Sequence, residues 1–390
     1  MIKCDAFTSM LLTLARRVYS GEDHKPVDED VRLHLLRNDF LPTDGDRRIL
    51  QVEINTISAG FAGVLESLSQ LHRSNRAVYY PSLRGEFPEN LPCTRFAEAM
   101  SVAVDLHNKK WGTQSRVIVF VVEEGERNIV DQYALDYRLS QQHGITVLRR
   151  SLGQLALTAS IELSGQLCVD GIEISLVYFR SGYDPKHYPT PKEWEARHLL
   201  ERSRSVKCPS LLGQLAGTKK VQQLWYEDGG RHLKNFGLSD SEIALLFEVF
   251  AIQTDPSVDA VSRAKAVGNA ENWVLKPQRE GGGNNLYGNE LKEALSTLTK
   301  DQLSQYVLME RMNPLPQPAL VVDGERTVSA GTIVPAVVEE SVSEVGLYSF
   351  YIPALNRNEV CGHLVRTKEK SVTEGGVNAG YAVLDTLHLV

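Results

Sequence analysis

The segment KPQREGGGNNLYG, residues 276–288, carries the most specific pattern in this chain. Its three consecutive glycines lack β-carbons, so their main-chain N–H groups can approach and surround an anion. Lys276 and Arg279 flank the glycines and add positive charge, which favours a triphosphate as the bound group. Glu280 stands there too, and a carboxylate repels an anion unless a cation lies between them. A flexible turn would explain the glycines alone, but the charged neighbours favour a phosphate-binding loop with a bound cation.

The residues on either side of this loop predict a compact α+β unit. The spacing matches neither G-x-x-x-x-G-K-[ST] nor G-x-G-x-x-G, which excludes a P-loop and a Rossmann fingerprint at this site. A short strand at 273–276 leads into the loop, and a helix capped by Asn289 follows it. Apolar residues of the helix recur at i, i+3, i+4 and i+7 on one face, namely Leu291, Ala294, Leu295 and Leu298. A strand at 306–309 closes the unit, which we call the lid module and place at about 270–311.

A second unit, upstream of the lid module, has the pattern of a parallel α/β domain. Residues 117–122 form a continuous β-branched and aromatic run, as in a strand that is buried on both faces. A helical stretch at about 130–142, a strand at 145–148 and a run at 172–179 follow in alternation, so we expect a small doubly wound domain. The other expected elements are strands at 49–56 and 360–367, helices at about 59–73 and 94–107, and surface connectors at about 75–89 and 226–235.

The composition is that of an ordinary globular chain and limits the partners to expect. The 390 residues carry a net charge of −7, which gives no electrostatic reason to expect nucleic acid or an anionic membrane as a partner. No apolar run approaches the roughly 18 residues of a membrane span, and the first residues lack a signal peptide's apolar core, so we expect a cytoplasmic protein. The five cysteines form no C-x-x-C pair and the ten histidines no H-E-x-x-H motif. Any metal should therefore be a hard cation with oxygen ligands.

The predicted strand near residue 53 offers such ligands. Strand alternation places Gln51, Glu53 and Asn55 on one face and apolar side chains on the other. The side-chain oxygens of Glu53 and Asn55, about 7 Å apart along the strand, suit a Mg²⁺ that takes its other ligands from substrate phosphates. The solvated outer face of an antiparallel sheet would give the same pattern and stays open as an alternative.

Two further polar clusters are candidates for binding. Arg366 and Lys368 share one face of a strand-like run and could hold a carboxylate and a phosphate, although a solvated basic edge has the same pattern. The cluster at 126–128, with Gln132, follows the carboxyl end of a buried strand, where α/β proteins bind ligands. A helix N-cap at Asn128 would explain part of this cluster without a ligand.

Taken together, these residues resemble the eukaryotic-type glutathione synthetases, ATP-grasp ligases that join γ-glutamylcysteine to glycine. The similarity extends, with gaps, from about Ile2 to the C-terminus, and the loop at 276–288 is its most specific part. The other matching words are EINTISA at 53–59, ERNI at 126–129, VYFR at 177–180, LAGTKKVQQ at 215–223 and HLVRTK at 363–368. Ordered words of this length do not recur by chance.

The resemblance implies an α/β (α+β) chain with an ATP-grasp fold, an inserted small parallel α/β substrate domain and a glycine-rich lid. Residues 1–112 would be the N-terminal part of the ATP-grasp core, and 113–215 the parallel substrate-binding domain. Residues 216–390 would complete the ATP-grasp core and include the lid module.

The resemblance also implies roles for individual residues. Mg²⁺ would be held against the ATP phosphates by Glu53, Asn55 and Glu280. The ATP site would consist of Glu53, Lys219, Lys276, Pro277, Gln278, Arg279, Glu280, Gly281, Gly282, Gly283, Asn284, Asn285, Tyr287, Met309, Glu310, Arg311, Met312, Glu344, Lys368 and Glu374. The dipeptide and the amino acid would contact Arg37, Ile57, Ser58, Ala59, Gly60, Glu126, Arg127, Asn128, Gln132, Arg180, Ser181, Gly182, Tyr183, Arg366, Val377 and Asn378. Catalysis would rest on Arg37, Lys276, Glu280 and Arg366.

The implied reaction needs charge neutralisation and no side-chain nucleophile. ATP would phosphorylate the C-terminal carboxylate of γ-glutamylcysteine, and the amine of glycine would attack the acyl phosphate and release phosphate. Mg²⁺ together with Lys, Arg and backbone N–H donors can stabilise both anionic steps. The glycine loop should close over the acyl phosphate, because water would otherwise hydrolyse it.

The chain departs from the family pattern in two respects. Family members begin upstream of Ile2, so we expect this chain to lack an N-terminal segment that helps to form the family's homodimer, although a homodimer is still expected. Asn378 replaces a usual alanine beside the amino-acid pocket and leaves open whether glycine, serine or β-alanine is preferred. The alternative function is a catalytically silent relative that binds substrate or regulates a full-length subunit, and the intact Glu53, Lys276 and Arg366 argue against it.

Overall fold

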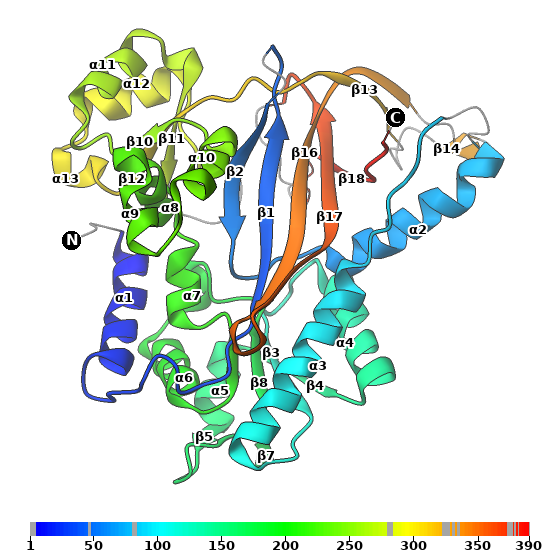
Figure 1. Cartoon of the computed structure of the whole chain (residues 1–390), viewed down its shortest axis with the longest axis vertical. Coiled ribbons are helices and arrows are strands. Elements are labelled where there is room, and N and C mark those ends of the chain that lie inside the picture. The colour runs from blue at the N-terminus through cyan, green and yellow to red at the C-terminus, as the bar shows by residue number, and fades with distance from the viewer. Residues whose placement is uncertain are drawn as a thin grey trace.

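The computed structural model describes residues 5–45, 48–79, 84–278, 284–321, 328–329, 332–333, 336–372, 377, 380 and 382–389. The architecture is mixed α/β. A long antiparallel sheet stands at the centre, a parallel sheet with helices on both faces lies at one end of it, and the lid module lies at one side (Figure 1). In the described part of the chain, no helix is long and apolar enough to cross a membrane.

The central sheet joins the two ends of the sequence. Its order is β18-β17-β16-β1-β2, with β13 also paired to β16, and every pair is antiparallel. The strands are β1 (His34–Pro42), β2 (Ile49–Asn55), β13 (Gln317–Val321), β16 (Ala336–Ile352), β17 (Arg357–Glu369) and β18 (Val383–Asp385). Because β1 lies between β2 and β16, residues near positions 40, 53 and 345 are neighbours on one surface.

The register of β1 against β2 corrects the predicted alternation of the second strand. Asp39 pairs with Glu53, but the next residue of β1 pairs with Gln51, so Val52 is the extra residue of a β-bulge. The bulge offsets the alternation by one residue, so that Val52 lines the same cavity as Glu53 and Asn55. Gln51 is buried away from that cavity, and the prediction that it shares a face with Glu53 was wrong.

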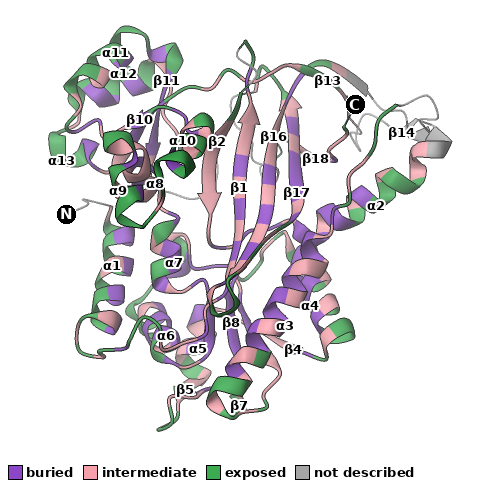
Figure 2. Ribbon diagram, viewed as in Figure 1, coloured by how far each residue is buried: buried purple, intermediate pink, exposed green. Residues whose placement is uncertain are grey.

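The parallel sheet has the order β4-β3-β8-β9 and confirms the predicted parallel α/β unit. Its strands are β3 (Val117–Val121), β4 (Thr146–Arg150), β8 (Leu176–Phe179) and β9 (Val206–Cys208). One face packs on α3 (Pro92–Trp111) and α4 (Ile129–His143), and the other on α1 (Ala6–Tyr19), α5 (Leu152–Thr158) and α6 (Pro191–Arg202). In β3, Phe120 faces the first core and Val119 the second, and both are buried. Figure 2 shows α3, which covers the first core, mostly in the colours of buried and intermediate residues. A strand covered on both faces needs an unbroken apolar run, which is why the sequence revealed it.

The lid module has a small antiparallel sheet of order β10-β12-β11. Its elements are β10 (Gln253–Thr254), α11 (Ala260–Gly268), β11 (Trp273–Pro277), α12 (Gly288–Thr297), α13 (Lys300–Leu303) and β12 (Tyr306–Glu310). Helix α12 buries the predicted residues Leu291, Ala294 and Leu295. It begins two residues earlier than expected, with Tyr287 at the N-cap position and Leu291 N–H bonded to the Tyr287 carbonyl, so the cap predicted at Asn289 was wrong.

The remaining elements connect these parts. They are α2 (Ala62–Tyr79), α7 (Leu211–Ala216), α8 (Lys219–Tyr226), α9 (Arg231–Asn235), α10 (Asp240–Val249), the small sheet of β5 (Ala159–Ile161), β6 (Leu167–Val169) and β7 (Ile172–Glu173), and the pair β14 (Val328–Ser329) and β15 (Thr332–Ile333). The run predicted at 172–179 is thus two strands, β7 and β8. The connector predicted at 226–235 contains helix α9, because Leu233 packs into a small apolar core there.

Candidate active site

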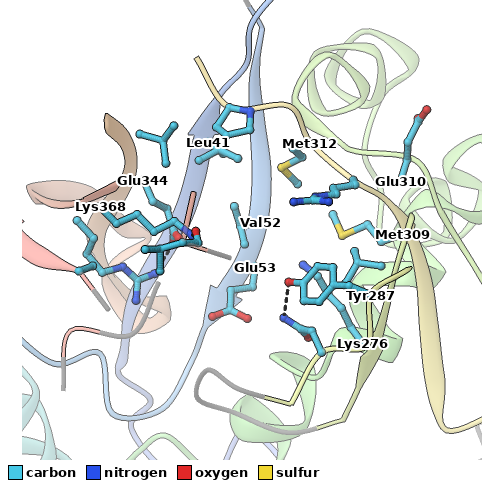
Figure 3. Close-up of a pocket in the computed structure, with 18 of the residues that line it drawn as sticks. Leu41, Val52, Glu53, Lys276, Tyr287, Met309, Glu310, Met312, Glu344 and Lys368 are labelled. Atoms are coloured by element: carbon cyan, nitrogen blue, oxygen red, sulfur yellow. Dashed lines mark hydrogen bonds and ion pairs between the residues drawn. The ribbon is translucent and has the colours of Figure 1, made fainter. Parts of the chain in front are cut away.

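A cavity of about 310 Å³ lies between the central sheet and the lid module (Figure 3). In Figure 3, Glu53 and Val52 on β2 face the centre of the cavity, with Glu344 and Lys368 on one side and Lys276, Tyr287 and Met309 on the other. The predicted site residues that line this cavity are Arg37, Glu53, Asn55, Lys219, Lys276, Asn285, Tyr287, Met309, Glu310, Arg311, Met312, Glu344, Arg366 and Lys368. The fold therefore brings together seven separate sequence segments, whose residues the resemblance assigned mainly to ATP and metal.

One half of the cavity is apolar. Its wall includes Leu41, Val52 and Val274, which the sequence had not singled out, together with Met309 and Met312. These side chains present a flat, low-polarity surface of the kind that binds a planar aromatic ring.

An aromatic residue and a basic residue close this half of the cavity. Tyr287 accepts a hydrogen bond at its hydroxyl from the carboxamide Nδ2 of Asn285 (3.3 Å). The guanidinium of Arg311 lies 5.6 Å from the centre of the Tyr287 ring, which is the range of a cation–π contact.

The other half of the cavity carries balanced charge. Glu53 lies 3.3 Å from Lys219 Nζ, measured from its Oε2. Burial disfavours the carboxylate, but Lys219, Lys276, Arg366 and Arg37 outweigh it and lower the pKa of Glu53 to about 2. Burial is also the main cause that lowers the pKa of Lys276, although the charge of Glu53 partly opposes this. This half is thus a concentrated set of cations around one ionised carboxylate.

The two arginines of the site are held by a residue that the sequence reasoning missed. Asp39 is 0% exposed and accepts two hydrogen bonds from Arg37, at 2.7 Å from Nε and 2.8 Å from Nη2. It also accepts from Asn55 Nδ2 at 3.0 Å and from Arg366 Nη2 at 3.2 Å. Arg366 pairs in addition with Glu344 across β16 and β17. A signal was available, because strand alternation in RND at 37–39 puts the carboxylate and the first arginine on one face.

A second group of predicted residues gathers beside the parallel sheet. Arg180 lies 3.0 Å from Glu126 and 3.3 Å from Asp131, and its carbonyl accepts from Ser58 Oγ at 3.0 Å. A β-carbon on Gly60 would lie 3.1 Å from Arg180 Nη1, so the glycine leaves room for the guanidinium. Gln132 pairs with Glu126, and the carboxamide of Asn128 lies close to Gly60. Ala59 and Gln132 also line a small pocket with Arg180, and Ile57 and Tyr183 line another with Lys219.

Tyr348 connects the two groups. Its hydroxyl donates to the carbonyl of Gly60 at 2.6 Å, and its strand position is directly opposite Arg37. The group of residues around Arg180 and the cavity are therefore adjacent regions of one site, and Tyr348 of β16 lies between them.

Some predicted residues do not line the cavity. Arg127 is exposed, and Ser181 is buried with its hydroxyl bonded to the carbonyl of Val121 at 3.3 Å. Gln278 turns away from the cavity, because its side-chain oxygen accepts from the main-chain N–H of Lys220 at 3.0 Å. Asn128 does precede α4, but its side chain makes no capping hydrogen bond, so the capping explanation fails.

The backbone places the other predicted positions. Pro277 pairs with Tyr306 in β11–β12, Gly182 N–H bonds to His187 Nδ1, Val377 lies in a turn, and Asn284 directly precedes Asn285. The predictions that fall outside the described residues are Arg279, Glu280, Gly281, Gly282, Gly283, Glu374 and Asn378.

The donor set around β2 fits a hard divalent cation. Glu53 and Asn55 place a carboxylate and a carboxamide on one face of the strand, beside the cationic half of the cavity. The carboxamide nitrogen of Asn55 is occupied by Asp39, which directs its oxygen away from that carboxylate. Two protein oxygens with room for phosphate ligands suit Mg²⁺. Among the described residues, no three or more His, Cys, Asp or Glu side chains form a group that could hold a metal on their own.

Comparison with known proteins identifies the family. The family model described as eukaryotic glutathione synthase, ATP binding domain, matches residues 1–389, and the chain belongs to this family of proteins. It is 37% identical over 405 residues to a chloroplastic glutathione synthetase of Solanum lycopersicum, covering 100% of this chain and 69% of that protein. It is 36% identical over 397 residues to the glutathione synthetase of Homo sapiens, covering 98% of this chain and 79% of that protein.

A solved structure supports the fold. A glutathione synthetase-like effector from Globodera pallida, determined in its apo form, aligns with a TM-score of 0.71 over 98% of this chain and 81% of that chain. At 16% identity this likeness concerns the fold alone. Together with the parallel sheet and the lid module, it confirms the expected mixed α/β fold with a parallel α/β unit.

Proposed function

We propose that this protein is an ATP- and Mg²⁺-dependent glutathione synthetase, which ligates γ-glutamylcysteine to glycine through an acyl phosphate. The observation that carries the proposal is the cavity between the central sheet and the lid module. It combines an apolar half with a half in which four cations hold Glu53 ionised. A nucleoside triphosphate has the matching chemistry, because it joins a planar base to a polyanion.

The apolar half would take the base. Val274 on β11 and Met309 on β12 pair across two strands, so their side chains form a continuous wall. Lys276, on the same strand as Val274, would then contact the phosphates. This spacing gives the nucleotide one orientation, with its terminal phosphate toward Arg37 and Arg366.

Mg²⁺ would be held by Glu53 and Asn55, with Glu280 as the third protein ligand that the resemblance implies. When bound, the cation supplies charge neutralisation on the phosphates and orients them. The side chains of the protein supply the other interactions. Lys219 and Lys276 offset the phosphate charge, and Arg37 and Arg366 orient the carboxylate that is phosphorylated.

The dipeptide would extend from the cavity toward Arg180. Arg180 is 4% exposed and already pairs with two carboxylates, so its guanidinium is fixed in place before substrate arrives. Tyr348 and Gly60 connect this arginine to Arg37 through one hydrogen bond and one strand pair. The reacting carboxylate would lie at the Arg37 end, next to the ATP phosphates.

The test is phosphate release by the purified chain with ATP, Mg²⁺ and γ-glutamylcysteine, with and without glycine. We expect release that needs both the dipeptide and the amino acid, with glutathione as the product by mass spectrometry. ATP binding without such release would instead support the alternative of a catalytically silent relative. The assay would then be repeated with a full-length glutathione synthetase subunit added. Serine and β-alanine in place of glycine measure the amino-acid preference.

A further inference from the structure

Asp39 has no contact with the cavity, yet it controls the side chains that line it. It is not among the lining residues and is 0% exposed, so a bound substrate does not touch it. Its oxygens hold Arg37 at 2.7 and 2.8 Å, Asn55 at 3.0 Å and Arg366 at 3.2 Å. We propose that Asp39 is a positioning residue of the ligase reaction, which fixes Arg37 and Arg366 toward the substrate anions. This inference rests on the proposed function.

The first argument concerns the orientation of Arg37. The bond pair from Nε and Nη2 to one carboxylate fixes the guanidinium plane as well as its position. Burial disfavours the charge of Arg37, but Asp39 outweighs it and raises the pKa of the guanidinium. Asp39 therefore keeps this arginine both charged and oriented.

The second argument concerns the two like charges. Arg37 and Arg366 are close enough that Arg37 disfavours the charge on Arg366, whereas Glu344 and Asp39 favour it. Two neighbouring guanidinium groups with no carboxylate between them would repel each other and separate. Because Asp39 bonds to both, it sets the distance between them.

The third argument concerns packing. Asp39 pairs with Gly346 of β16, and a β-carbon on Gly346 would lie 2.6 Å from Asp39 Oδ1 and 3.0 Å from Arg37 Cδ. The glycine is what allows the carboxylate and the arginine to fit under the strand. The close approach of β16 therefore helps to hold this pair in place without a ligand.

The experiment compares Asp39→Asn with the wild-type chain. The amide keeps the shape but loses the negative charge and one acceptor, so the arginines move. We expect turnover to fall about 10²-fold, the scale of a 1 Å misplacement of a reacting group. In an Arg366→Lys background the same substitution should cost less than about tenfold, because residues that act through one another are not additive.

A matched control separates positioning from stability. Glu201 on α6 is also 0% exposed and pairs with Arg197 at 2.8 Å, but it lies in the parallel domain and lines no part of the cavity. Glu201→Gln should lower the melting temperature without the turnover loss. Three results would each overturn the proposal. The first is an equal loss of turnover in Glu201→Gln, and the second is a turnover of Asp39→Asn within about threefold of wild type. The third is full additivity of Asp39→Asn with Arg366→Lys.

A binding measurement decides the inference even if the chain proves silent. Calorimetric titration with γ-glutamylcysteine should show an affinity about tenfold weaker for Asp39→Asn than for wild type, the cost of one displaced charged hydrogen bond. Wild-type binding without phosphate release would refute the proposed function but leave the positioning role standing. Unchanged affinity in Asp39→Asn, or no dipeptide binding to wild type, would refute the positioning role.

Discussion

The ionised state of Glu53 predicts a specific loss of stability in acid. The pKa of Glu53 is lowered from 4.5 to about 2 in the folded protein. A carboxyl group whose pKa is depressed by folding stabilises the native state at pH values above the unfolded pKa, and that contribution is lost as the pH falls through the folded pKa. The full contribution is about 3 kcal/mol at neutral pH. Between pH 7 and pH 3.5 about 1 kcal/mol of it disappears, because the unfolded carboxyl group is then mostly protonated and the folded one is not.

The assay is urea unfolding at pH 7 and pH 3.5 for the wild type and Glu53→Gln. The difference in free energy of unfolding between the two proteins should shrink by about 1 kcal/mol at the lower pH, because the glutamine cannot titrate. Glu293→Gln, at an exposed position on α12, controls for the loss of one negative charge. A difference between wild type and Glu53→Gln that is the same at both pH values would refute the conclusion that the surrounding cations hold Glu53 ionised.

Three further predictions concern the cavity and its substrates. Glu280→Gln should keep the fold and lower turnover by roughly 10², the scale for removing a group that stabilises transition-state charge, and near-wild-type turnover would remove Glu280 from the metal site. Asn378→Ala should change the preference among glycine, serine and β-alanine more than the affinity for ATP, and unchanged selectivity would show that this position does not select. Gly346→Ala should cost about 1–3 kcal/mol of stability and lower turnover, because its new β-carbon collides with buried groups. Gly268→Ala, with open space around the added carbon, is the control, and equal behaviour of the two variants would contradict the packing argument.

Local patterns predicted the elements whose burial leaves a periodic trace in the sequence. The buried strand β3 reads as an unbroken apolar run because both of its faces are covered. Helix α12 shows its core stripe because only one face packs. The β-bulge at Val52 leaves no such trace, since it depends on how β2 pairs with β1 and not on the strand's own residues.

The site was predictable where chemistry and position agree within one segment. Glu53 and Lys276 each belong to a short word whose residue types already indicate metal and phosphate. Gln278 belongs to such a word too, but a hydrogen bond to the main chain of Lys220 turns it away from the cavity. The role of Asp39 depends on a partner 327 residues away, Arg366, and no local spacing encodes that pairing.

Glu53 and Asp39 differ in exposure, and this difference distinguishes what each carboxylate can do. Glu53 has a side chain that is 24% exposed, and it faces the cavity, so a cation can reach it and replace the lysine contact it makes in the unliganded site. Asp39 is 0% exposed and is fully engaged by two arginines and Asn55, so it remains bound to them whether or not substrate is present. Under the proposed function the site would use both carboxylates: Glu53 would hold the metal that accompanies the phosphates, and Asp39 would keep the arginines in place. The first carboxylate is visible in the sequence as a ligand motif, whereas the second becomes visible only when the sheet brings β1, β2 and β17 together.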